Sequence, residues 1–173
     1  KHKTGTDRIH EALKKSNIRD VDLIMNLQGD EPAIDIQDIV SLNDKMIQNT
    51  SNIGTLAATI KDKKNLKNEN IVKVITENTL EDNNFPKGIS FLRKSKQLEN
   101  IYRHIGVYCY SKDSLEKFIQ LSQSKNEIEN RLEQLRALDN NIDINVSLAK
   151  SSPIGVDTEE DYLALKKIME YKN

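Results

Sequence analysis

Two short acidic turns stand where apolar, strand-like runs end, in parts of the chain that are far apart in sequence. The first is "QGDEP" at 28–32, and the second is "GVD" at 155–157. Ligands of α/β sheets bind at the carboxyl ends of strands, where a glycine lets the backbone approach them closely. Mg²⁺ prefers a few carboxylate oxygens completed by water and substrate phosphate. Asp30 and Asp157 are therefore candidates to bind one Mg²⁺ together.

Helix capping is a second interpretation of these turns, and spacing alone favours it. Asp30 precedes an amphipathic stretch at 34–49, and Asp157 and Thr158 stand at the start of the final one. Asp and Thr side chains commonly accept hydrogen bonds from the first backbone N–H groups of a helix. Both interpretations stay open on the residues alone.

The N-terminal segment "TGTDR", at 4–8, offers a possible phosphate site. Free N–H groups at a helix start and an arginine fork both bind phosphate, so Thr6, Asp7 and Arg8 are candidates for nucleotide binding. An ordinary helix start, capped by Thr6 or Asp7 and followed by an exposed Arg8, explains the pattern equally well.

The aromatic run at 102–110 carries a polar face. Strand alternation places His104, Gly106 and Tyr108 on one side. That side suits a polar ligand, and it suits a half-buried sheet at a dimer contact equally well. Glu133 and Gln134 lie in a charged helical stretch, where exposure to solvent is the default expectation.

Composition excludes several classes of protein. The 173 residues carry a net charge of −1 with both signs interspersed, so there is no basic surface for nucleic acid or a membrane. No apolar run has the length of a bilayer span, and no G-x-S-x-G, H-E-x-x-H or P-loop motif occurs. Cys109, the only cysteine, lies in an apolar run, which indicates a packed thiol and fits a reducing cytoplasm.

Strand and helix patterns alternate along the chain. The periodicity predicts helices at 8–15, 34–49, 111–121, 126–138 and 158–171, and strands at 21–27, 53–60, 70–77, 88–92, 102–110 and 144–150. This alternation indicates one α/β domain, 1–173, with a largely parallel sheet. Because the chain starts in a loop that leads to a helix, we expect an N-terminal portion to be absent.

Six segments together resemble one family. They are "TGTDRIHEA", "MNLQGDEPAI", "VKVITE", "YRHIGVYCY", "RLEQLRAL" and "GVDTEEDY", which span nearly the whole chain. In this order they resemble CMP-Kdo synthetase, the 3-deoxy-manno-octulosonate (Kdo) cytidylyltransferase. The resemblance implies a three-layer, Rossmann-like nucleotide-diphospho-sugar transferase fold with a predominantly parallel mixed sheet. It also implies transfer of CMP from CTP to Kdo, for lipopolysaccharide synthesis in the cytoplasm by a homodimer.

The resemblance also assigns roles to residues. It implies that Asp30 and Asp157 bind Mg²⁺ as the catalytic pair and that the turn Thr6, Asp7 and Arg8 lies by the nucleotide. It implies a sugar pocket lined by Gln28, Arg93, His104, Tyr108, Glu133 and Gln134. A metal held by carboxylates would stabilise the charge that develops on the phosphate oxygens during attack on the α-phosphorus.

The sequence also departs from the family pattern. The family's first strand and its basic phosphate loop would precede residue 1. The loop at 78–100 lacks the Ser and Ile-Pro usual beside the sugar-contacting arginine, and Asn130 stands where Glu is common. Two alternatives therefore accompany the Kdo prediction. One is a sialic-acid-type or amino-Kdo cytidylyltransferase, and the other is a non-catalytic fragment for dimerisation or ligand binding.

Overall fold

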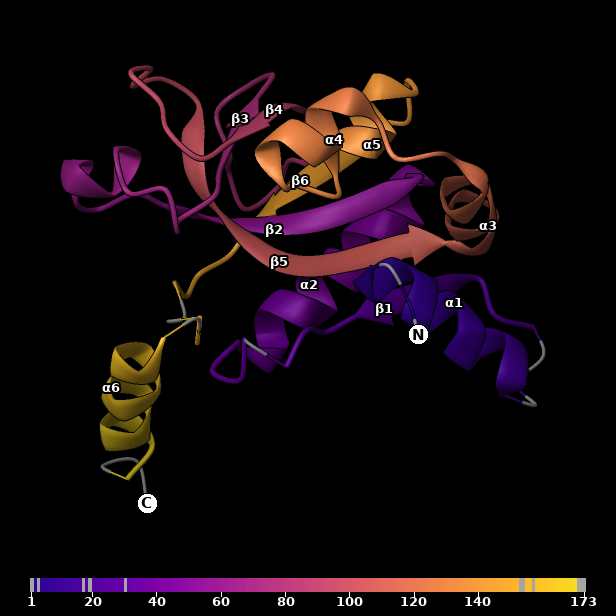
Figure 1. The fold of residues 1–173 in the computed structure, drawn as a ribbon, viewed down its shortest axis with the longest axis horizontal. Helices are drawn as coiled ribbons and strands as arrows, with labels where there is room; N and C mark the ends of the chain where they lie inside the picture. The colour runs from indigo at the N-terminus through magenta and orange to yellow at the C-terminus, as the bar shows by residue number, and fades with distance from the viewer. Residues whose placement is uncertain are drawn as a thin grey trace.

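Six strands form one mixed sheet with helices on both of its faces (Figure 1). The computed structural model describes residues 2, 4–16, 18, 20–29, 31–152, 155–156 and 158–170, without the side chains of 161, 168 and 169. The strands are β1 (Leu23–Asn26), β2 (Ile53–Thr59), β3 (Lys73–Thr76), β4 (Gly88–Leu92), β5 (Ile101–Ser111) and β6 (Ile144–Leu148). The helices are α1 (Gly5–Lys15), α2 (Ile36–Asn49), the 3₁₀ turn η1 (Lys63–Leu66), α3 (Lys112–Gln120), α4 (Lys125–Asn130), α5 (Leu135–Asp139) and α6 (Glu159–Glu170).

Strand alternation divides most of the core into two clusters, one on each face of the sheet, and a smaller third cluster contains Leu66, Ile75 and Ile101. On one face, Leu42 and Met46 of α2 pack against Leu56, Ile105 and Val107 of the sheet. On the other face, side chains of α1, α3 and α5 pack against a set that includes Ile24, Ile53, Val74, Tyr102, Tyr110 and Val146. Figure 1 shows α2 and the α4–α5 pair on opposite sides of β2 and β5. The α/β class predicted from the alternation and the three-layer fold that the resemblance implies are therefore confirmed.

The expected strand direction needs a correction. The sheet order is β4-β3-β5-β2-β6, with β1 also paired to β5, and β2–β6 is the one parallel pair among the described strands. A predominantly parallel sheet requires a crossover, usually helical, between successive strands. The connections between successive strands from β2 through β3 and β4 to β5 contain only the short turn η1 and loops, so these strands can run antiparallel.

The helix predicted at 126–138 is interrupted, and the interruption shapes the site. Arg131 adopts the left-handed conformation, with φ of 54°, and ends α4. The Leu132 N–H then turns back to the carbonyl of Glu127, at 3.2 Å. As a result Leu132 is buried, and the two residues after it lie in a turn before α5.

Two capping predictions also change. Thr4, not Thr6 or Asp7, is the N-cap of α1, and Asp7 completes a capping box with it. Asp35, not Asp30, caps α2. Cys109 is fully buried, and burial raises the pKa of its thiol to about 11, which confirms the prediction of a packed thiol. Among the described helices, none combines the length and the apolar character of a bilayer span.

Candidate functional site

The candidate site lies at a gap in the sheet beside β5. The antiparallel register with β1 ends at Asn26 opposite Tyr108, and the register with β3 begins at Lys73 opposite Arg103. The N–H of His104 still donates to a carbonyl beyond β3, that of Val72, at 2.9 Å. On this edge of β5, the segment 105–107 therefore faces neither β1 nor β3.

A cavity of about 770 Å³ opens over this gap. All six residues that the resemblance assigns to the sugar pocket line it: Gln28, Arg93, His104, Tyr108, Glu133 and Gln134. They come from the end of β1, the end of β4, the middle of β5 and the turn between α4 and α5. The fold thus brings together side chains from four separate parts of the sequence.

His104 is a buried, neutral imidazole held by Thr55. The Thr55 hydroxyl donates to the carbonyl of Val107 at 2.7 Å, and the carbonyl of Ile105 lies 3.3 Å from it. The same hydroxyl lies 3.0 Å from His104 Nε2. Because the single hydroxyl proton goes to a carbonyl, Nε2 must carry the proton that it donates to Thr55. Nδ1 is then left as a hydrogen-bond acceptor. Burial lowers the pKa of His104 to about 3, so the ring stays neutral near pH 7.

Tyr108 and Tyr110 extend the same face of β5. The rings of His104 and Tyr108 lie 5.4 Å apart, and those of Tyr108 and Tyr110 lie 6.0 Å apart. Burial raises the pKa of both phenols well above the ordinary value. Both hydroxyls therefore remain protonated and can donate as well as accept a hydrogen bond.

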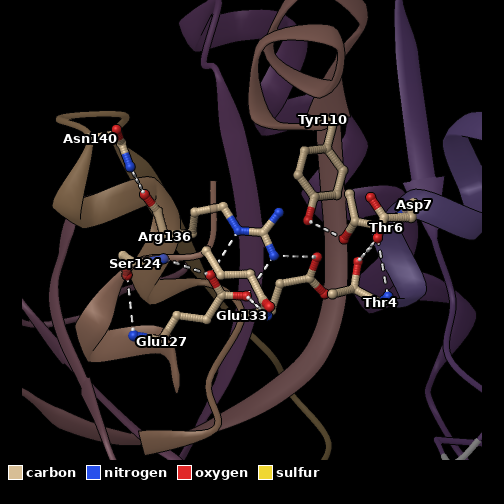
Figure 2. Close-up of polar contacts among 10 residues, drawn as sticks. Thr4, Thr6, Asp7, Tyr110, Ser124, Glu127, Glu133, Arg136 and Asn140 are labelled. Carbon is tan, nitrogen blue, oxygen red and sulfur yellow. Dashed lines mark hydrogen bonds and ion pairs between the residues drawn. The ribbon is translucent and has the colours of Figure 1, made fainter. Parts of the chain in front are cut away.

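Glu133 and Gln134 are drawn into the protein, contrary to the solvated default for a charged helix. Gln134 is buried, and the Glu133 atom Oε1 is shielded from solvent with no hydrogen-bond partner among the described residues. Figure 2 shows Glu133 between Arg136 and the start of α1, with Arg136 Nη2 4.0 Å from Oε1. Burial raises the pKa of the Glu133 carboxyl, although the hydroxyls of Thr4 and Thr6 oppose this. A buried oxygen without a donor suits the hydroxyl group of a ligand.

A buried ion pair holds the turn that carries Glu133. Arg136 donates from Nε to Glu127 Oε2 at 2.8 Å and from Nη2 to Oε1 at 2.5 Å (Figure 2). The guanidinium also stacks 4.7 Å from the ring centre of Phe118. Burial opposes ionisation of Glu127, but the hydrogen bonds from Arg136 and Gln123 outweigh it and lower the pKa of Glu127. The pair therefore ties α4 to α5 across the left-handed break.

Arg93 provides a cation at the far wall of the cavity. Its guanidinium donates to three backbone carbonyls, those of Glu69, Asn130 and Arg131, at 3.0 to 3.2 Å. Since a guanidinium has five N–H groups, two remain for a ligand. The buried Lys73 fixes the backbone of Arg93 by donating to its carbonyl at 2.6 Å.

The turn Thr6, Asp7 and Arg8, expected near the nucleotide, lies next to the cavity but does not line it. The Thr6 side chain is buried, with its hydroxyl 3.4 Å from that of Tyr110, and Asp7 is engaged in the capping box. Arg8 is exposed. Gly5 packs against Gln28 so closely that an added Cβ would lie 2.8 Å from Nε2. The first turn of α1 thus abuts the cavity wall, although Thr6, Asp7 and Arg8 do not line it.

The predicted Mg²⁺ ligands, Asp30 and Asp157, lie outside the described residues. Described residues on either side of each line the same cavity: Gln28 and Glu31 around the first, and Gly155 and Thr158 around the second. Within the described part of the chain, no cluster of three or more His, Cys, Asp or Glu side chains is arranged to hold a metal.

Other lining residues escaped the sequence analysis. They include Asn68, Asn70, Val72, Arg103, Tyr110 and Glu160. Tyr110 shares the parity of His104 and Tyr108, so alternation contained the signal for it. Arg103 has the opposite parity, and its long side chain reaches Ser152 at 3.2 Å. No local pattern marks the residues of the 68–72 loop.

Comparison with known proteins fits this arrangement. Residues 1–144 match the model of the family described as Cytidylyltransferase. The chain belongs to the cytidylyltransferase family. The 3-deoxy-manno-octulosonate cytidylyltransferase of Bartonella henselae is 38% identical over 171 residues, which cover 97% of this chain and 70% of that protein. The enzyme of the same name from Thermodesulfovibrio yellowstonii is 37% identical, over 98% and 71%.

A solved structure supports the same family. A CMP:2-keto-3-deoxy-manno-octonic acid synthetase, complexed with CTP, matches 99% of this chain and 70% of its own, with a TM-score of 0.86 and 28% identity. The resemblance of this cytidylyltransferase chain to the CMP-Kdo synthetase family is therefore confirmed.

Proposed function

We propose that this protein is a Kdo cytidylyltransferase, which transfers CMP from CTP to the anomeric hydroxyl of Kdo and releases pyrophosphate for lipopolysaccharide synthesis. The observation that carries the proposal is the cavity beside β5, where six polar residues from four separate parts of the sequence meet. The proposal is also supported by the 38% identity of this chain to the 3-deoxy-manno-octulosonate cytidylyltransferase of Bartonella henselae.

The residues of the cavity suit a sugar acid. Arg93 keeps two N–H groups for a carboxylate. His104 offers Nδ1 and Glu133 offers Oε1 as acceptors for hydroxyl protons. Tyr108 and Gln134 can each donate and accept. This set holds the acceptor sugar in one orientation, which converts an encounter in solution into an aligned attack.

The proposed reaction is a nucleophilic displacement at the α-phosphorus of CTP. The anomeric oxygen forms a bond to the α-phosphorus of CTP, and the bond from that phosphorus to the bridging oxygen breaks. Pyrophosphate leaves with the electron pair, and the hydroxyl proton passes to solvent. No described residue is assigned as a covalent nucleophile.

We further propose that Asp30 and Asp157 hold Mg²⁺, with Thr6, Asp7 and Arg8 near the nucleotide. The support is that the neighbours of both aspartates line one cavity, and that carboxylate oxygens are suitable Mg²⁺ ligands. When bound, the ion would neutralise charge on the triphosphate. On the family resemblance we also propose a cytoplasmic homodimer; a monomeric mass in light scattering would refute the dimer.

A direct assay tests the function. The full-length protein is mixed with CTP, Kdo and Mg²⁺, and pyrophosphate and CMP-Kdo are measured. Release of both in equal amounts is expected. A parallel reaction with sialic acid or amino-Kdo identifies the acceptor, and faster turnover of either would replace Kdo in the proposal. Absence of turnover with all three would favour the non-catalytic alternative.

A further inference from the structure

Gly106 occupies the middle of β5 and lines the cavity. It lies between His104 and Tyr108 in sequence, on the same side of the strand. A glycine inside a strand loses more conformational entropy on folding than any other residue and contributes no packing. Its presence at this position therefore calls for a specific reason.

The two common structural reasons do not apply. No described glycine has a positive φ, so the backbone at Gly106 suits any residue. An added Cβ at Gly106 would meet nothing within 4 Å, so packing does not require a glycine either. The glycines at 54 and 88 differ, since a Cβ there would lie 2.6 Å from Met46 Sδ and 3.1 Å from Val146 Cγ2, respectively.

The backbone of Gly106 points into the gap between β1 and β3. Even-numbered residues on either side of it direct their N–H groups toward this edge: His104 to Val72, and Lys112 to Asp22. Odd-numbered residues face β2 instead, since the carbonyls of 105 and 107 accept from Thr55. The β2 register skips 106 and 107, since Leu56 pairs with Ile105 and Thr55 with Tyr108. The N–H directions on either side place the N–H and C=O of Gly106 toward the cavity, where the registers with β1 and β3 do not reach them.

We propose that Gly106 is a specificity-determining residue of this site. Its backbone N–H and C=O bind hydroxyl groups of the polyhydroxylated acid, and its missing side chain leaves the space that they occupy. A donor and an acceptor on one residue match neighbouring hydroxyls, because each hydroxyl both donates and accepts. The inference rests on the proposed function and assigns to it a contact that side-chain motifs do not reveal.

The test compares Gly106→Ala with Gly88→Ala in the full-length protein. In Gly106→Ala the added methyl group takes up ligand space, so the KM for Kdo should rise about tenfold or more. The KM for CTP and the Tm should stay close to wild type, because the methyl group meets no protein atom. In Gly88→Ala, which lies on β4 outside the cavity, the Tm should fall while the KM for Kdo is unchanged.

The outcomes separate the two proposals. An unchanged KM for Kdo in Gly106→Ala, beside an active wild type, overturns this inference alone. A Tm loss in Gly106→Ala as large as that in Gly88→Ala shows a structural glycine and also overturns it. A wild-type protein that does not turn over Kdo overturns the proposed function and this inference with it.

Discussion

Acidification should destabilise this protein through His104 before its carboxylates titrate extensively. In the folded protein, burial lowers the pKa of His104 to about 3, while the ordinary value is 6.5. As the pH falls below 6.5, the unfolded chain binds a proton at this residue and the folded protein does not. The stability that comes from the neutral ring is therefore present above pH 6.5 and is lost as the pH falls toward 3.

The size of the effect follows from the two pKa values. Each pH unit below 6.5 costs about 1.4 kcal/mol for one proton, so the step from pH 7.5 to pH 5.0 removes about 2 kcal/mol of unfolding free energy. The measurement is urea unfolding, followed by circular dichroism, at both pH values. His104→Gln is the matched variant, because it keeps the other titrating groups of the chain.

The difference between the two proteins isolates His104. Wild type should lose about 2 kcal/mol more than His104→Gln between these pH values. Equal losses would show that the ring is protonated in the folded state or exposed, and would refute the neutral acceptor at Nδ1. If the variant does not fold, the imidazole NMR signals of wild type serve instead, and a protonated His104 at pH 5.0 gives the same refutation.

Four further variants test the packing around the cavity and the proposed metal ligands. Arg136→Ala strands Glu127 as a buried, unpaired carboxylate and should cost about 3–5 kcal/mol in urea unfolding; a loss under 1 kcal/mol would contradict the buried pair. Asp38 accepts three hydrogen bonds from Lys150 and Ser151, just after β6. Asp38→Ala should therefore lower the free energy of unfolding by about 1–3 kcal/mol, and an unchanged Tm would show that these hydrogen bonds do not stabilise the fold. Asp30→Asn and Asp157→Asn should each lower kcat by about 10²-fold or more with an unchanged circular dichroism spectrum, and wild-type turnover in either would reject the metal assignment.

The periodicity of the sequence predicted most of the strands and helices that surround the cavity. Alternation along β5 placed His104 and Tyr108 on one side, and the structure confirms this by their ring contact. The strand prediction at 88–92 matches β4, and α3 lies within the helix predicted at 111–121. These features are local, because each depends on the spacing of neighbouring residues.

The features that the sequence did not predict depend on distant contacts. The left-handed Arg131 lies in a continuous helical pattern, so nothing in the periodicity marks the turn that buries Gln134. Arg93 is oriented by carbonyls that lie 24 to 38 residues away in sequence. Strand direction likewise depends on connections that carry no helix, which apolar runs alone do not reveal.

The charge pattern of the cavity favours a sugar acid over a neutral sugar. Near β5 the cavity offers two acceptors, Nδ1 of His104 and Oε1 of Glu133, beside the hydroxyls of Tyr108 and Tyr110, which donate as well as accept. At the far wall, the two remaining N–H groups of Arg93 attract a carboxylate. A ligand with its acid group at one end and its hydroxyls at the other satisfies both walls at once. A neutral sugar would satisfy only the acceptors and leave the guanidinium without its anion.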